Sequence, residues 1–213
     1  MTTLASIDDE VPADRKRAQS KPGERRVQIL HALAEMLEHP KGEKITTAAL
    51  AAKLDVSEAA LYRHFASKAQ MFEGLIEFIE TTILGLINRI ASEHPLDQPN
   101  AGRAQAHAIC TMLLRFAEQN RGMTRVLIGD ALVGEHERLQ ERINQLHERI
   151  ELALKQALRL VVAQGESANE FDPNARANLA FSFVVGKWHC FAKSGWKKPP
   201  SDDWDKQSPA LLR

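Results

Sequence analysis

Cysteine, aromatic residues and long apolar runs are all scarce in this chain of 213 residues. The two cysteines, Cys110 and Cys190, lie far apart inside apolar stretches and form no CxxC pair. This arrangement predicts two reduced core thiols, with a disulfide or a shared metal as the alternative. No apolar run approaches the roughly 20 residues of a membrane-spanning helix. Acidic residues stand near the N-terminus where a signal peptide has bases, so we expect a cytoplasmic protein.

Net charge is also absent, because 28 basic residues balance 28 acidic ones. This balance excludes a uniformly basic nucleic-acid coat, but it allows a local basic patch, since binding responds to the local field. Residues 1–14 carry four acids and no bases, whereas residues 15–70 carry eleven bases and six acids. The positive excess therefore lies in one N-terminal block, which is where we expect a nucleic-acid interface.

Apolar residues recur at spacings of three and four along most of the chain, and no strand-like alternation lasts more than a few residues. The hydrophobic content of 44% is enough for a sizeable core. We therefore predict an all-α fold. The expected helices cover residues 24–37, 46–54, 58–64, 68–92, 103–119, 123–132, 136–163 and 174–194.

Three short helices followed by a long one have the layout of a helix-turn-helix domain. The alanines of residues 48–52 are small enough to let the second helix lie close to the third. Asp55 stands at the turn, where a residue that tolerates left-handed backbone is required. Ser57 and Ser67 are suited to cap the third and fourth helices. We therefore expect the third helix to enter a DNA major groove.

The string Leu61-Tyr62-Arg63-His64-Phe65-Ala66-Ser67-Lys68 resembles the recognition-helix end of TetR-type repressors. The resemblance implies an N-terminal three-helix DNA-binding domain and a C-terminal helical dimerisation domain. We predict DNA contacts from exposed polar, cationic and small residues: Thr46, Thr47, Ser57, Glu58, Ala59, Tyr62, Arg63, His64 and Lys68.

Four regions follow from this organisation. Residues 1–21 are expected to be a disordered tail, because they mix polar residues, proline and charges without an apolar period. The helix-turn-helix domain covers 22–68, and a helical dimerisation and partner-binding domain covers 69–198. Residues 199–213 are expected to form a polar C-terminal tail that ends in a short helix.

The long helix expected at 136–163 carries an apolar seam. Leu139, Ile143, Leu146 and Ile150 follow one another at spacings of four, three and four, as in a coiled coil. We predict that these four residues form the dimer interface. The helix at 174–192 is expected to pair with this seam as a four-helix bundle across a two-fold axis.

Segments 56–65, 71–80, 124–129 and 138–151 resemble the nucleoid occlusion factors, a family within the TetR type. The resemblance implies a homodimer that binds specific chromosomal sites and uses no cofactor or small inducer. When bound to DNA, it would inhibit ring assembly by the tubulin-like division protein FtsZ.

The resemblance also places Phe78 and Asn120 on the FtsZ-binding surface. For Phe78 the alternative is an ordinary core position. Familiar members of the family have basic residues on this surface where this chain has Leu86 and Gln119, so the resemblance implies an altered, shifted or lost FtsZ-binding surface here. Arg89 and Arg121 are the candidates for the missing charge.

A ligand-responsive TetR-type repressor is the alternative function, because it would share every DNA-binding residue. A chromatin protein without sequence preference is a third possibility. An enzyme is not expected. His136-Glu137 and His147-Glu148 begin like a zinc-protease motif, but neither is followed by the second histidine. We therefore predict no catalytic or metal-binding residues and a cytoplasmic, nucleoid-associated protein.

Overall fold

The computed structural model describes residues 22–39, 45–95, 98–166 and 171–212. Helices are the only regular structure within these ranges, so the all-α prediction is confirmed. The tail expected at 1–21 lies outside the described residues. The elements are α1 (Pro22–Leu37), α2 (Thr47–Lys53), α3 (Glu58–Tyr62), α4 (Lys68–Glu93), α5 (Ala101–Gln119), α6 (Arg121–Leu127), the 3-10 turn η1 (Asp130–Leu132), α7 (Glu137–Ala163), α8 (Pro173–Lys193) and α9 (Trp204–Leu212).

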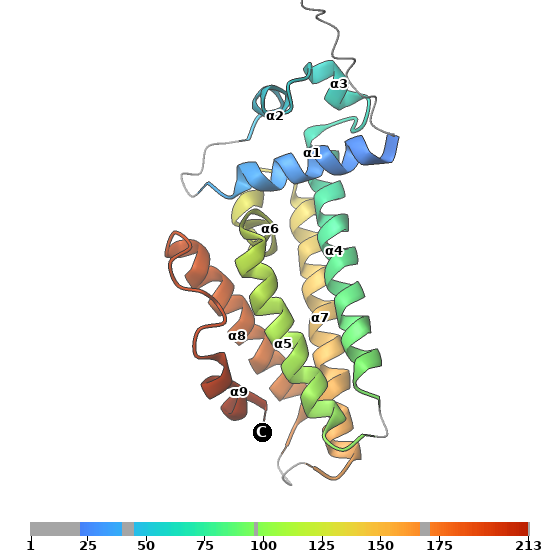
Figure 1. The fold of residues 1–213 in the computed structure, drawn as a ribbon, viewed down its shortest axis with the longest axis vertical. Coiled ribbons are helices and arrows are strands. Elements are labelled where there is room, and N and C mark those ends of the chain that lie inside the picture. Colours follow the sequence, from blue (N-terminus) through green and yellow to red (C-terminus); the bar gives the residue numbers. More distant parts are fainter. Residues whose placement is uncertain (1–21, 40–44, 96–97, 167–170, 213) are drawn as a thin grey trace, which may run out of the picture.

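The molecule is elongated, with the short helices α2 and α3 at one end and α9 beside the other end of the bundle (Figure 1). α1 lies across the top of a bundle formed by α4, α5, α7 and α8, while α2 and α3 lie on the outer side of α1. α4 connects the two parts. In the described part of the chain, no helix is both long and apolar enough to cross a membrane.

Side-chain caps determine where the helices of the N-terminal domain begin. The hydroxyls of Thr46, Ser57 and Ser67 each accept a hydrogen bond from the backbone N–H three residues downstream, at 3.1–3.3 Å. Each cap satisfies a donor that the first turn of a helix leaves unpaired. Asp55 has a φ of 52°, which confirms the left-handed turn between α2 and α3.

The bundle core is built from the inner faces of its four long helices. Phe72, Ile79 and Leu146 are almost fully buried there, and so is Trp188, whose Nε1 donates to the carbonyl oxygen of Leu113 at 3.1 Å. That hydrogen bond satisfies the one polar atom of the largest core side chain. The core is therefore continuous from α4 across α5 and α7 to α8.

The segment after residue 198 is part of the bundle, not a tail. The short helix expected there is present as α9, and its Trp204 is 3% exposed. The indole Nε1 of Trp204 donates to Oγ1 of Thr111 at 2.8 Å, and its ring stacks on His107 at 5.4 Å between centroids. The assignment of 199–213 to a polar tail is therefore wrong for residues 199–212, because two apolar anchors, Trp204 and Leu212, dock α9 on α5 and α8.

The two cysteines differ in environment. Cys110 is fully buried, and burial raises the pKa of its thiol to about 12. Cys190 is exposed on α8, and both thiols are free. The prediction of a reduced core thiol is confirmed for Cys110 and is wrong for Cys190. Neighbouring residues of a helix point in different directions, so Trp188 and Phe191 face the core while Cys190 faces outward.

The end of α1 is clamped to the bundle by polar contacts with its backbone. Arg125 of α6 donates to the carbonyl oxygens of Leu37 and His39 at 3.1 and 3.0 Å, and its Nε pairs with Asp130 at 2.6 Å. The indole of Trp196, beyond α8, donates to the carbonyl oxygen of Glu38 at 2.9 Å. These bonds satisfy orphan carbonyls at the C-terminus of α1 and couple the DNA-binding domain to the bundle.

His147 is a titratable group inside the bundle. It packs edge-on against Phe181 at 5.2 Å between ring centroids, and its Nε2 is buried without a hydrogen-bond partner among the described atoms. Burial lowers the pKa of His147, with a smaller contribution from the charge of His189, while a hydrogen bond to the backbone of Leu127 opposes the shift. The neutral imidazole is therefore favoured in the folded protein.

We expect acid to destabilise the protein through His147. The folded-state pKa of His147 lies below the unfolded value of about 6.5. Its contribution to the free energy of unfolding is therefore complete above pH 6.5 and is lost as the pH falls from there through the folded-state pKa. The slope from one proton is at most about 1.4 kcal/mol per pH unit. Urea unfolding from pH 7.5 to 5 is expected to show a smaller loss in His147→Gln than in the unchanged protein. Identical pH profiles would contradict this role.

Candidate nucleic-acid interface

The outer end of the molecule is formed by α2, the left-handed turn and α3 (Figure 1). Leu50, Leu61 and Phe65 are buried beneath them and fix the angle between the two helices. The predicted DNA-contact residues that lie exposed on this surface are Thr46, Ser57, Glu58, Ala59, Tyr62 and Arg63. Thr47 and His64 are half-buried at its edges. The helix-turn-helix thus presents one face with hydroxyl, cationic, acidic and small groups, as base and phosphate contacts require.

A hydrogen-bonded group orders the polar side chains between α2 and α3. Oγ1 of Thr47 donates to Oε2 of Glu58 at 2.6 Å, and the Tyr62 hydroxyl lies 3.4 Å from the same Oγ1. Glu58 is therefore held at the start of α3 with lone pairs still available. A carboxylate in this position can accept a hydrogen bond from a cytosine amino group in the major groove.

Arg26 of α1 supports the recognition helix, a role that the sequence analysis did not predict. It donates to the carbonyl oxygen of His64 at 3.2 Å, and its guanidinium lies 4.2 Å from the centroid of the Phe65 ring. These two contacts hold the C-terminal end of α3. Spacing along the chain gives no signal for this role, because the residues are 38 positions apart.

Unlike the other predicted DNA contacts, Lys68 is already paired with an acidic residue. Its ammonium forms a salt bridge with Glu135, which precedes α7, and lies 5.5 Å from the centroid of the Phe72 ring. Only 22% of the Lys68 side chain and 14% of the Glu135 side chain are exposed. Lys68 therefore joins the DNA-binding domain to the bundle, and a phosphate would compete with Glu135 for its ammonium.

The two positions expected to face a protein partner lie on different elements of the fold. Phe78 is half-buried on α4, with its ring edge-on to His31 of α1 at 5.6 Å. Asn120 lies between α5 and α6, where its Nδ2 donates to the carbonyl oxygen of Phe116 at 2.9 Å. Phe78 thus lies at the boundary of the core.

A hollow of about 600 Å³ lies between α4 and α5, and neither Phe78 nor Asn120 is among its lining residues. Leu86 and Gln119, the two departures from the family pattern, both line it, and so does Arg89. Arg121 is not among its lining residues. The complete lining is Leu86, Arg89, Ile90, Glu93, His107, Ala108, Thr111, Met112, Arg115, Phe116 and Gln119.

The predicted dimer seam is wrong. Leu139, Ile143, Leu146 and Ile150 are each at most 1% exposed within the single chain, because they belong to its own core, where α7 packs on α4, α5 and α8. A 4-3-4 spacing defines one apolar face of a helix but not the chain against which that face packs. Residues that already form the core of one chain cannot bury further surface against a second chain.

The opposite faces of α7 and α8 carry an apolar surface that we did not predict. Leu152 of α7 and Leu179 of α8 are 49% and 48% exposed. On α8, Leu179 belongs to an exposed stripe of small and apolar residues at spacings of four, three, four and four: Ala175, Leu179, Ser182, Gly186 and Cys190. A Cβ added to Gly186 would meet no atom within 4 Å. Glycine within a helix is unfavourable unless a neighbour approaches closely, and no neighbour does so here.

Comparisons with known proteins agree over both parts of the chain. Residues 29–75 match the tetR family of bacterial regulatory proteins, and residues 103–213 match the SlmA-like, tetracyclin repressor-like C-terminal domain. A TetR transcription regulator from Haloarcula marismortui superposes with a TM-score of 0.73 at 13% identity, covering 89% of this chain and 97% of that one. The latter similarity establishes the fold alone.

Closer relatives are proteins named nucleoid occlusion factor SlmA. The one from Idiomarina loihiensis is 49% identical over 183 residues, which is 86% of this chain and 91% of that protein. The one from Alteromonas mediterranea is 47% identical over 187 residues, which is 88% of this chain and 93% of that protein. Identity at this level across both domains shows that the chain belongs to the SlmA family of nucleoid occlusion factors, within the TetR-type regulators.

Proposed function

We propose that this protein is a homodimeric, sequence-specific DNA-binding protein that prevents FtsZ rings from assembling over the nucleoid while it is bound to DNA. The observation that carries the proposal is a sequence identity of 47–49% to nucleoid occlusion factors over both domains. The role is regulatory rather than catalytic. A ligand-responsive repressor is less well supported, because the relatives that match the bundle domain are named for nucleoid occlusion.

DNA binding is assigned to the outer face of α2 and α3. Arg63 is exposed at the end of the recognition helix, where its guanidinium can reach a phosphate. Glu58 is held by Thr47 at the start of the same helix, where it can accept from a base edge. Arg63 would therefore contribute mainly to DNA affinity, and Glu58 to the selection of the base sequence.

We expect Arg63→Ala to weaken binding to all DNA sequences. Loss of one phosphate contact per subunit, two per dimer, should reduce the slope of log affinity against log salt by about 1.8. Glu58→Ala is the matched variant on the same helix, and it should leave this slope unchanged while altering the ranking among sites. Fluorescence anisotropy with duplexes that the protein selects from a random pool, at several salt concentrations, measures both. An unchanged slope in Arg63→Ala would refute the phosphate contact.

Dimerisation is assigned to the outer face of α7 and α8. Two half-exposed leucines, Leu152 and Leu179, supply the apolar area. Gly186 supplies a point where two helices can approach closely, because its α-carbon faces open space within the chain. Packing of α7 and α8 against the same helices of a second subunit would form a four-helix bundle. A bundle of these helices was expected from the sequence, but its centre would be formed by their outer faces and not by the seam of α7.

FtsZ binding is assigned to the hollow between α4 and α5. Phe78 and Leu86 supply apolar surface on α4, where they are two helical turns apart on one face. Arg89 and Arg115 line the same hollow. We propose that they replace the charge missing at Leu86 and Gln119, and that Arg121 does not.

Sedimentation of FtsZ polymers tests the function directly. The protein bound to a selected duplex is expected to reduce the pelleted FtsZ, whereas the DNA-free protein should have little effect. Leu86→Glu and Arg89→Ala should each weaken the inhibition at least five-fold, and Arg121→Ala is the matched arginine control. Unaltered FtsZ polymers at saturating protein–DNA complex would eliminate the proposed function.

Phe78→Ala separates a partner contact from a core contact. A surface role predicts weakened FtsZ inhibition with an unchanged melting temperature and unchanged DNA affinity. A drop of several degrees, with both activities reduced equally, would assign Phe78 to the core instead.

A further inference from the structure

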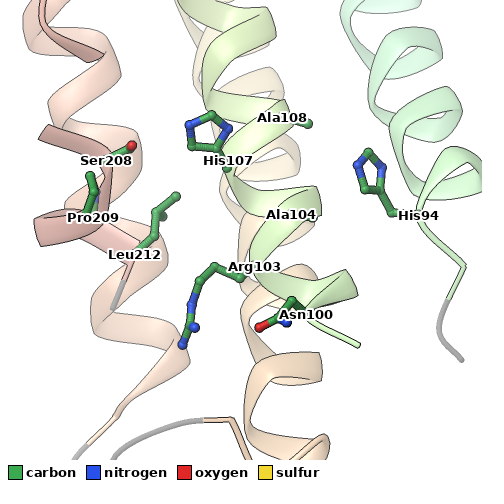
Figure 2. Close-up of a pocket in the computed structure, with 9 residues that line it drawn as sticks. All are labelled: His94, Asn100, Arg103, Ala104, His107, Ala108, Ser208, Pro209 and Leu212. Carbon is green, nitrogen blue, oxygen red and sulfur yellow. The ribbon is translucent and has the colours of Figure 1, made fainter. Parts of the chain in front are cut away.

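A second hollow lies at the end of the bundle far from the DNA-binding domain. It has a volume of about 580 Å³ and is bordered by α5, α9 and the end of α4. Figure 2 shows His94 on one side of α5 and Ser208, Pro209 and Leu212 of α9 on the other. We call it the distal hollow, and the one between α4 and α5 the proximal hollow.

The two hollows adjoin each other along α5. His107 and Ala108 line both of them. The residues of this stretch that face either hollow follow the spacing of one helix face: Asn100, Arg103, Ala104, His107, Ala108, Thr111, Met112, Arg115, Phe116 and Gln119. At 1.5 Å per residue this face is about 28 Å long, which matches an extended segment of about eight residues.

The floor and walls of the distal hollow are well supported. Ala104 and Ala108 have small side chains, so the surface of α5 is low between the two walls (Figure 2). Trp204 is buried beneath α9 and stacks on His107, which fixes this wall against α5. The hollow therefore exists in the folded bundle before any partner binds.

The charge along the adjoining hollows favours an acidic segment. Three arginines, Arg89, Arg103 and Arg115, line them, against one carboxylate, that of Glu93. The guanidinium of Arg103 donates to the backbone carbonyl oxygen of Glu166 at 3.1 Å, but its buried Nε has no hydrogen-bond partner among the described residues.

We propose that the FtsZ segment bound in the proximal hollow continues along α5 and ends in the distal hollow, where an acidic group lies between the end of α4 and α9. This inference rests on the proposed function. It gives α9 a role as one wall of the partner site. It also adds the charge of Arg103 at the distal end to the charges that Arg89 and Arg115 supply at the proximal end.

Opposite charges at one exposed site on α9 test the proposal. In Pro209→Glu the affinity of the protein–DNA complex for full-length FtsZ is expected to fall at least three-fold, whereas Pro209→Lys should raise it. The difference should shrink as salt increases from 50 to 300 mM. Ala104→Trp, which fills the hollow, should weaken binding at least ten-fold. Ala91→Trp, on the opposite side of α4, is the matched control and should bind normally.

The outcomes distinguish this proposal from the function on which it rests. If Leu86→Glu weakens FtsZ binding while Ala104→Trp and both Pro209 variants bind like the unchanged protein, the distal site is wrong and the proximal site stands. If the unchanged complex binds no FtsZ, both fail. Melting temperature and DNA affinity are measured for each variant. Should Ala104→Trp unfold, the sign and salt dependence of the Pro209 pair decide.

Discussion

Replacing Gly122 with alanine is expected to lower the free energy of unfolding by about 3 kcal/mol, at the upper end of what overpacking costs. A Cβ at this position would lie 1.8 Å from the carbonyl oxygen of Ala34 and 3.2 Å from the Cβ of Leu37. The nearest atom belongs to the backbone of α1 and cannot rotate away, so α1 and α6 must separate. In a protein of this size the melting temperature should fall by roughly 6–12 °C.

The same change is expected to weaken DNA binding. Separation of α6 from α1 would strain the bonds from Arg125 to the end of α1, and α1 in turn supports the recognition helix through Arg26. Gly85→Ala is the matched control, because a Cβ added there meets no atom within 4 Å. Alanine at that helical position should stabilise the protein by up to about 1 kcal/mol. Unchanged melting and DNA affinity in Gly122→Ala would contradict the close packing of α1 on α6.

Leu179→Glu is expected to produce folded monomers with specific DNA affinity reduced about a hundred-fold or more. A carboxylate at the centre of the outer face of α8 would have to be buried without a partner in the dimer. The monomer keeps its own core, because Leu179 is half-exposed. Loss of the second helix-turn-helix removes the gain that comes from binding two half-sites together.

Two comparisons make the dimer prediction specific. Val133→Glu introduces the same group at an apolar residue that is 83% exposed near η1, and it should remain dimeric. Leu146 belongs to the seam that the sequence predicted as the dimer interface. Leu146→Glu should instead unfold the protein, since Leu146 is 1% exposed in the single chain. Sedimentation velocity and circular dichroism separate these results. A dimeric Leu179→Glu would exclude the outer face of α8 as the interface.

The helices of the N-terminal domain were predictable because their determinants are local. A capping hydroxyl acts on a backbone N–H three residues away, as Thr46, Ser57 and Ser67 do. Asp55 adopts a left-handed backbone that few residue types tolerate. Neither determinant depends on which distant helix packs nearby, so spacing and residue type were sufficient.

The predictions that failed all concern what packs against a helix face. The 4-3-4 seam of α7 has the same pattern in an intrachain core and in a coiled coil, and only its burial against α4, α5 and α8 distinguishes them. α9 looks polar because its anchors, Trp204 and Leu212, are only two residues in a short segment. The DNA contact predicted for Lys68 stays a prediction, but its salt bridge with Glu135 could not be predicted, because it joins positions 67 residues apart.

By itself, the sequence determined that this protein is helical, that it carries a TetR-type helix-turn-helix and where its helices begin, because periodicity, caps and turns act within a few residues. Only the tertiary structure decided which faces of α7 and α8 remain exposed, that α9 belongs to the bundle and that Leu86, Arg89 and Gln119 line one hollow. These features depend on which apolar faces cover one another. Burial is non-directional, so an amphipathic helix specifies that one face is covered but not which neighbour covers it.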